Sequence, residues 1–286
     1  MRDHDVEKIA ASLAPGFESD LFRAALRNLD DLENPLRFNN FAYAARELVD
    51  QTLERLAPAP NVKGCPWYTQ ETNLNGGVSR RQRAWYAIQG GLIDEYLAES
   101  LDLDTRSIHS SLAATLRELN KHTHVGPETF DRPAADVSHL VDQTLAAIAG
   151  LLITIEDCRN RVHGRLASSI DTAAVEEVLR ETVMAIDEIA PHHSIQNVSV
   201  GLTKLLGIDE EYVHFEATGS ISCILQWGSN SDVRRGDGLE LPQSFPFSCE
   251  LRSAVAEPDE IETVEDSLRV DTGNWVDVMY GRDEFA

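Results

Sequence analysis

The sequence is poor in positive charge. Its 286 residues include 25 Lys and Arg against 48 Asp and Glu, which leaves a formal net charge of −23 at pH 7. An acidic surface of this kind repels nucleic acids and anionic lipids over long distances. The composition therefore excludes binding of nucleic acid by a general basic surface. Any such binding needs a local basic site, a bound metal ion or a basic partner.

Cysteines are also few, and a long hydrophobic run is absent. The four cysteines, Cys65, Cys158, Cys223 and Cys249, lie far apart and form neither a zinc knuckle nor a C-x-x-C redox motif. No window of roughly 18 residues is continuously apolar, and the polar start of the chain lacks the apolar core of a signal peptide. These absences predict a soluble cytoplasmic protein with reduced thiols and no membrane segment.

The first two thirds of the chain show helical periodicity. Apolar residues recur at three- and four-residue spacing over residues 37–56 and 134–166, which is typical of helices with one buried face. Ser79 followed by Gln82 is a capping box that predicts a helix start, and two adjacent glycines predict its end. Further helices are predicted over residues 6–13, 19–29, 105–124 and 172–189.

Beyond residue 190 the period changes from 3.6 to 2, which indicates strands. Residues 212–227 alternate between apolar and polar side chains, except at residues 218–220, which predict a turn or bulge. Residues 245–251 alternate again, and residues 275–280 suggest a last strand. The pattern therefore predicts several antiparallel strands near the end of the chain.

These two periodicities together predict an α+β protein. A helical bundle is expected over residues 1–190 and a small antiparallel β-rich domain over residues 191–286. Residues 259–266 are acidic and are predicted to be a mobile connection. No internal repeat is present.

One candidate catalytic motif lies near the end of a predicted helix, where Arg117 is followed by Lys121, His122 and His124. An arginine with a histidine after four or six intervening residues resembles the motif of the HEPN superfamily, helical bundles of which many are metal-independent ribonucleases. In this chemistry histidine moves the proton of the 2′-hydroxyl group, and arginine holds the scissile phosphate.

Helix geometry distinguishes the two histidines. On an ideal helix His124 lies about 20° from Arg117, whereas His122 lies about 140° away. Arg117 and His124 are therefore the candidate catalytic pair, His122 is the alternative if the last turn unwinds, and Lys121 would add a phosphate contact. The alternative interpretation is a solvated stripe of cations at a helix C-terminus.

A second candidate site is formed by three arginines in the first turn of one predicted helix, Arg80, Arg81 and Arg83. The helix dipole disfavours cations at this end. One explanation is an anion, such as a phosphate, held jointly by the helix N-terminus and the guanidinium groups. The alternative is that the arginines pair with some of the many carboxylates of the chain.

A third candidate lies between two predicted strands and contains Asp232, Asp237 and Glu240. Closely spaced carboxylates can hold Mg²⁺ for phosphodiester hydrolysis. The alternative is a hairpin loop in which these acids pair with Arg234 and Arg235. A further Arg/His cluster at residues 159–163 is interpreted as a structural helix end.

Several segments of the chain resemble a bacterial family, the predicted pPIWI-associating nucleases. The resemblance is most specific over residues 226–247. The segments that carry it are NPLRFNNF (34–41), REL (46–48), SRRQRA (79–84), YAIQGGL (86–92), KHTH (121–124), LQWGS (225–229) and SFPF (244–247).

The resemblance implies a nuclease that acts in a prokaryotic anti-phage defence system. If the helical site is active, no cofactor is needed; if the carboxylates of the β region are active, Mg²⁺ is needed. The expected partners are nucleic acid, RNA before DNA, other defence proteins and a second copy of the chain, because HEPN-like sites are completed across a two-fold axis. The alternative function is a non-catalytic module that dimerises and senses a ligand or partner.

Overall fold

The chain folds into two compact units in the computed structural model. The structure describes residues 2–71, 76–102, 104, 107, 110, 113–114, 117, 125–126, 130–180, 184–273 and 275. Unit 1 comprises Met1–Val162 together with Asp209–Glu211, and unit 2 comprises His163–Ile208 and Tyr212–Ala286.

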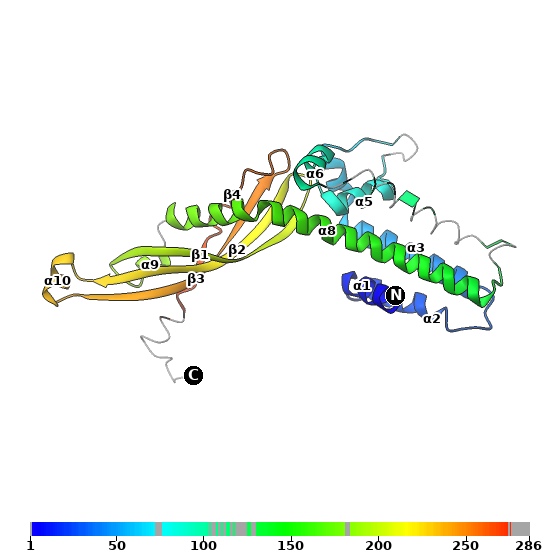
Figure 1. Ribbon diagram of the computed structural model, residues 1–286, viewed down its shortest axis with the longest axis horizontal. Helices are drawn as coiled ribbons and strands as arrows, with labels where there is room; N and C mark the ends of the chain where they lie inside the picture. Colours follow the sequence, from blue (N-terminus) through cyan, green and yellow to red (C-terminus); the bar gives the residue numbers. More distant parts are fainter. Residues whose placement is uncertain are drawn as a thin grey trace. The chain divides into compact units, whose positions relative to one another are not determined.

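Unit 1 is built from helices (Figure 1). Helix α3 is its central element, and it begins and ends where the apolar spacing predicts. Its buried face includes Phe38, Phe41, Leu48 and Leu53, each at most 2% exposed. The described helices of this unit are α1 (Arg2–Ser12), α2 (Phe17–Arg27), α3 (Arg37–Leu56), α4 (Ala59–Gly64), α5 (Arg80–Gln89), α6 (Asp94–Leu101) and the first part of α8 (Ala134–Arg180).

Helix α5 has the predicted capping box. The Ser79 hydroxyl accepts from the backbone N–H of Gln82 at 3.2 Å, and the Gln82 side chain accepts from the backbone N–H of Ser79 at 3.0 Å. The helix ends at Gly90, whose φ of 56° is a conformation that favours glycine. Both ends of α5 are therefore set by local sequence.

Helix α8 is continuous from Ala134 to Arg180, so the prediction of separate helices over residues 134–166 and 172–189 is wrong. The residues between those ranges include neither glycine nor proline, and nothing interrupts the backbone hydrogen bonds. By length and composition α8 could cross a membrane. The core helix of a soluble protein can have the same length and apolar composition, however. In α8, 44% of the most apolar 18-residue stretch is buried within the protein.

Unit 2 contains an antiparallel sheet in the strand order β1-β2-β3-β4, with β5 also paired to β3. Three long strands, side by side in Figure 1, form most of it. This arrangement confirms the α+β class. The elements of unit 2 after α8 are α9 (Met184–Asp187), β1 (His192–Ile208), β2 (Tyr212–Trp227), α10 (Asn230–Arg235), β3 (Leu239–Ala254), β4 (Glu262–Thr263) and β5 (Arg269–Val270).

Strand β2 is unbroken through the predicted turn or bulge at residues 218–220, and the register shift at this level lies in β1, between Val200 and Leu202. Gly219 is a site of close approach: a Cβ there would lie 2.2 Å from the backbone oxygen of Ser199 and 2.6 Å from the Phe247 ring. The glycine is therefore required by packing across the sheet and does not mark a turn.

Two expectations for the end of the chain are also changed. The acidic connection at residues 259–266 contains β4, which pairs with β3. Trp275 lies in a helical position and stacks on Trp227 with ring centroids 6.2 Å apart. The rest of the strand expected over residues 275–280 lies outside the described residues.

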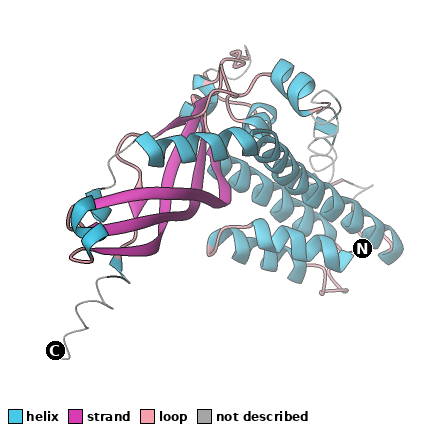
Figure 2. Ribbon diagram, turned by 60° about the vertical axis from the view of Figure 1, so that its left-hand side comes forward, coloured by secondary structure: helices cyan, strands magenta, loops and turns pink. Residues whose placement is uncertain are grey.

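The second part of α8 covers one face of the sheet within unit 2 (Figure 2). Its side chains Leu166, Ile170 and Val178 are fully buried, as is Phe215 of β2. His163 of α8 also lies 2.8 Å from the Thr203 hydroxyl of β1. Although the change from helix to strand falls at residue 192, the compact units therefore divide inside α8, because the sheet needs this helix to bury its apolar face.

Candidate functional site

The predicted Arg/His motif is only partly described. Arg117 occupies an exposed helical position. Lys121, His122 and His124 lie outside the described residues. The pairing of Arg117 with a histidine therefore stays a prediction of the sequence.

The three arginines at the start of α5 each contact a carboxylate of unit 1. Arg80 pairs with Asp50 of α3, Arg81 with Glu71 at 3.1 Å, and Arg83 with Glu54 at 3.2 Å. Arg81 also lies over the Trp85 ring, 5.2 Å from its centroid. The structure thus shows the arrangement that the pairing alternative predicts, in which local carboxylates neutralise cations at an unfavourable helix end.

The hairpin acids between β2 and β3 are engaged locally. Asp232 caps α10, accepting from the backbone N–H of Ser229 at 2.8 Å and from its hydroxyl at 2.6 Å. These hydrogen bonds hold the pKa of Asp232 below its ordinary value. Arg235 lies 2.6 Å from Asp232 and 3.5 Å from Asp237, while Glu240 is an exposed residue of β3.

A metal site is not assembled by these three acids. Asp232 and Asp237 share Arg235, and Glu240 stands opposite Gln226 in the ladder. Across the residues that the structure describes, no three His, Cys, Asp or Glu side chains gather as metal ligands. The geometry of the hairpin fits the ion-paired loop that the sequence offered as the alternative to Mg²⁺ binding.

A polar cluster that the sequence did not predict surrounds Glu210 in unit 1. The Asn61 side chain of α4 donates to the Glu210 carboxylate at 2.7 Å, and the Tyr86 hydroxyl of α5 donates to the same oxygen at 3.3 Å. The Gly91 N–H donates to the backbone oxygen of Asp209 at 2.7 Å. A Cβ at Gly91 would lie 2.5 Å from the Glu210 backbone oxygen, so the close approach requires glycine.

The same cluster keeps a thiol and a phenol protonated. Burial raises the pKa of Cys65 to about 12, and the nearby carboxylates of Glu210 and Asp209 add to this. Burial and Glu210 also raise the pKa of Tyr86 above its ordinary range. At neutral pH Cys65 is therefore a poor nucleophile and Tyr86 a neutral hydrogen-bond donor.

The Arg/His cluster at residues 159–163 does not mark a helix end, because α8 continues to Arg180. Its members have separate surroundings. Arg161 is exposed and pairs with Asp157 at 3.1 Å. The His163 imidazole forms a hydrogen bond with the Thr203 hydroxyl, and both residues belong to unit 2. Arg159, in unit 1, is half-buried.

Sequence reasoning missed the cluster around Glu210 because its members are distant along the chain. Asn61 and Glu210 are 149 positions apart, and Tyr86 and Glu210 are 124 apart. The sequence feature that could have indicated this cluster is the pair Gly90 and Gly91. Gly90 is explained by the end of α5, whereas Gly91 has no role in that helix and instead permits the close contact with Glu210.

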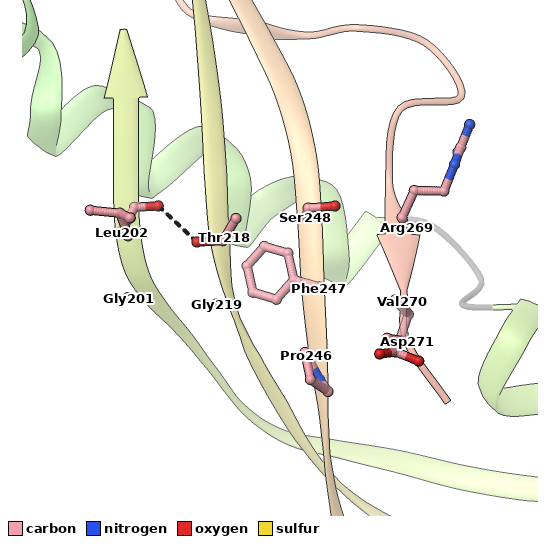
Figure 3. Close-up of a pocket in the computed structure, with 10 residues that line it drawn as sticks. All are labelled: Gly201, Leu202, Thr218, Gly219, Pro246, Phe247, Ser248, Arg269, Val270 and Asp271. Atoms are coloured by element: carbon pink, nitrogen blue, oxygen red, sulfur yellow. Dashed lines mark hydrogen bonds between the residues drawn. The ribbon is translucent and has the colours of Figure 1, made fainter. Parts of the chain in front are cut away.

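Unit 2 carries an open groove of about 630 Å³ on its sheet. Figure 3 shows the Phe247 ring beside Gly219, with Leu202 and Thr218 on one side and Arg269 on the other. The Thr218 hydroxyl donates to the backbone oxygen of Leu202 at 3.3 Å. The groove is largely apolar, with the charged residues Arg269 and Asp271 at one end.

Comparison with known proteins gives a consistent family. Two family models, each described as predicted pPIWI-associating nuclease, match residues 10–148 and residues 155–276. No curated protein and no solved structure matches the chain.

Proposed function

Because the chain belongs to the predicted pPIWI-associating nuclease family, we propose that it cleaves phosphodiester bonds of RNA or DNA in a prokaryotic anti-phage defence system. The two family matches, which extend over most of the chain, are the observation that carries this proposal. The cytoplasm is the proposed compartment, and other defence proteins are the proposed partners.

The helical motif is the proposed catalytic site, with RNA as the first substrate. His124 takes the proton of the 2′-hydroxyl group, whose oxygen then attacks the phosphorus while the bond to the leaving 5′-oxygen breaks. The leaving oxygen regains a proton from an imidazolium or from water. Arg117 and Lys121 contact the phosphate and offset its developing charge. The bundle of a second copy completes the site in a homodimer, and this chemistry needs no metal ion.

The proposal is tested by incubating the purified protein with labelled RNA and DNA, with and without Mg²⁺ and Mn²⁺. RNA cleavage without metal supports the helical site. Cleavage that requires metal supports Asp232, Asp237 and Glu240, after rearrangement of their present ion pairs. Absence of cleavage of every substrate contradicts the nuclease function.

Single substitutions then identify the residues. We expect Arg117→Ala and His124→Ala each to reduce cleavage by roughly 100-fold or more, because each removes a transition-state contact. Arg117 is exposed, so its removal should leave the thermal unfolding midpoint nearly unchanged. His122→Ala is the matched control, and exchanged phenotypes of the two histidine variants would assign the role to His122. Full activity of both variants would exclude this site.

A non-catalytic sensing module is the second candidate function, and the groove of Figure 3 is the observation that favours it. The paired state of Arg80, Arg81 and Arg83 points the same way, because these cations are already neutralised by carboxylates. Such a module would bind a small ligand at Phe247 and Arg269 and would show no cleavage.

A further inference from the structure

Arg159 places a charged group in a half-buried position of unit 1. It follows Cys158, which is 1% exposed, and lies one turn of α8 before Val162, which is fully buried. Arg159 itself is half-buried. A guanidinium in such a place normally has a carboxylate or several hydrogen-bond acceptors beside it, because an isolated buried charge is costly.

No such partner is found for Arg159 among the described residues. Other arginines of unit 1 differ: Arg161 pairs with Asp157, Arg83 with Glu54, and Arg55 with Glu18 at 2.7 Å. The contrast is informative because the chain holds 48 acidic residues against 25 basic ones. Carboxylates are abundant, yet none in the described part of the chain neutralises this cation.

Two described side chains act on the pKa of Arg159, and both are uncharged at neutral pH. Burial lowers the pKa of Arg159, and the side chains that oppose this change are those of Cys158 and Tyr86. Burial raises the pKa of Cys158 to about 11, so the thiol keeps its proton. Tyr86 is also neutral, and its hydroxyl is occupied by Glu210. Since arginine stays protonated in proteins, its positive charge is not balanced by any side chain that the structure describes.

We propose that Arg159 is an anion-binding residue of unit 1 and that it takes the phosphate group of a ligand. The planar guanidinium matches two phosphate oxygens, and a partly desolvated site strengthens the contact. The choice of phosphate rather than carboxylate as the ligand rests on the proposed nuclease function. The assignment of Arg159 as an anion-binding residue is independent of that function, because Arg159 lies on α8 and is none of the proposed catalytic residues. The phosphate belongs either to a nucleic-acid backbone or to a free nucleotide.

The test measures binding without cleavage. Calorimetric titrations of the full chain use inorganic phosphate, a mononucleotide and a short single-stranded RNA made uncleavable by 2′-O-methylation. We expect Arg159→Ala to weaken binding of at least one phosphate probe by about 10-fold or more. Preference for the RNA indicates a backbone phosphate, and preference for the mononucleotide indicates a free ligand. Acetate at the same concentration is the probe for carboxylate, and tighter binding of acetate would overturn the assignment to phosphate.

Arg161→Ala is the matched control, because Arg161 lies two positions along the same helix, is exposed and already has a carboxylate partner. The affinity of the Arg161→Ala variant for every probe should stay within about two-fold of the affinity of the unchanged protein. Arg159→Met provides a second readout, because it keeps an apolar stem and removes an uncompensated charge. It should raise the unfolding midpoint by about 2–4 °C in phosphate-free buffer and abolish the further rise that phosphate causes.

Two outcomes would overturn the proposal. One is that the unchanged protein binds none of the phosphate probes. The other is that Arg159→Ala and Arg159→Met bind them as the unchanged protein does. A protein that binds phosphate through Arg159 and cleaves no nucleic acid would contradict the proposed nuclease function while supporting this inference.

Discussion

At the scale of single residues, most arginines of unit 1 whose contacts are described lie beside carboxylates. The most buried of these pairs joins α2 to α3: the Arg55 guanidinium donates to both oxygens of Glu18, at 2.7 and 2.9 Å. The Glu18 carboxylate also accepts from the backbone N–H of Ala14 at 2.9 Å, and its side chain is only 8% exposed. This carboxylate therefore has the partners that a buried charge requires.

Glu18→Gln should reduce the free energy of unfolding at pH 7 by about 1–3 kcal/mol, because it weakens two charge-assisted hydrogen bonds in a buried place. The bond to Arg55 lowers the pKa of Glu18 from its ordinary value of 4.5. The unfolded chain therefore takes up this proton more readily than the folded chain. The contribution is present above pH 4.5 and is lost as the pH falls through the lower pKa of the folded protein.

Urea unfolding of both proteins at pH 7 and at pH 3 checks this expectation, and the stability difference should shrink at the lower pH. Asp20→Asn is the control. Asp20 lies in the same helix and pairs with Arg23, but both side chains are more than 60% exposed, so its loss should change stability by less than about 1 kcal/mol. Equal effects of the two substitutions would contradict the role of burial.

At the scale of elements, β2 shows how packing decides what a glycine means. Gly219 stands opposite Phe247 in the ladder, and β1 approaches from the other side. Both neighbours come close to the position of a Cβ atom. The two neighbouring strands can approach this closely because the residue has no side chain.

Gly219→Ala should destabilise unit 2 by about 1–3 kcal/mol, because the added methyl group overlaps backbone as well as the Phe247 ring. Gly150→Ala is the matched control. Gly150 lies in α8, where an added methyl group would meet no neighbouring side chain within 4 Å, and the substitution should gain up to about 1 kcal/mol from its higher helix propensity. Thermal unfolding followed by circular dichroism measures both changes. A neutral Gly219→Ala would show that the strands can move apart without cost.

At the scale of the whole molecule, α8 belongs to both compact units. Its second part buries Leu166, Ile170, Ala174 and Val178 completely. A division of the chain at residue 190 separates the sheet from this helix, whereas a division before His163 keeps them together.

We therefore expect a fragment of residues 163–286 to fold and a fragment of residues 191–286 to expose the apolar face of the sheet. The shorter fragment should bind the dye ANS and lose its near-ultraviolet circular dichroism, because specific packing is lost. The longer fragment should unfold cooperatively. Cooperative unfolding of the shorter fragment without dye binding would show that the sheet is stable without α8.

The candidate sites depend on contacts between residues that are distant in the sequence, and such contacts could not be predicted from it. The sequence indicated that Arg80, Arg81 and Arg83 need anions, but it could not identify them, because Asp50 and Glu54 lie on another helix. The cluster of Asn61, Tyr86 and Glu210 was not predicted at all. Its members come together only when the segment Asp209–Glu211 joins unit 1.

By itself the sequence determined the elements whose signals are local. Helix α3, the capping box of α5 and the change to strands after residue 190 follow from spacing and cap chemistry within a few residues. Only the tertiary structure decided the continuity of α8, the strand β1 and the partners of each charge. Strand β1 escapes the alternation rule because register shifts, beginning between Ile195 and Asn197, break its period of two. Contacts between residues that are distant in the sequence depend on how the chain packs, and the pattern of residues along the sequence does not specify which of them come into contact.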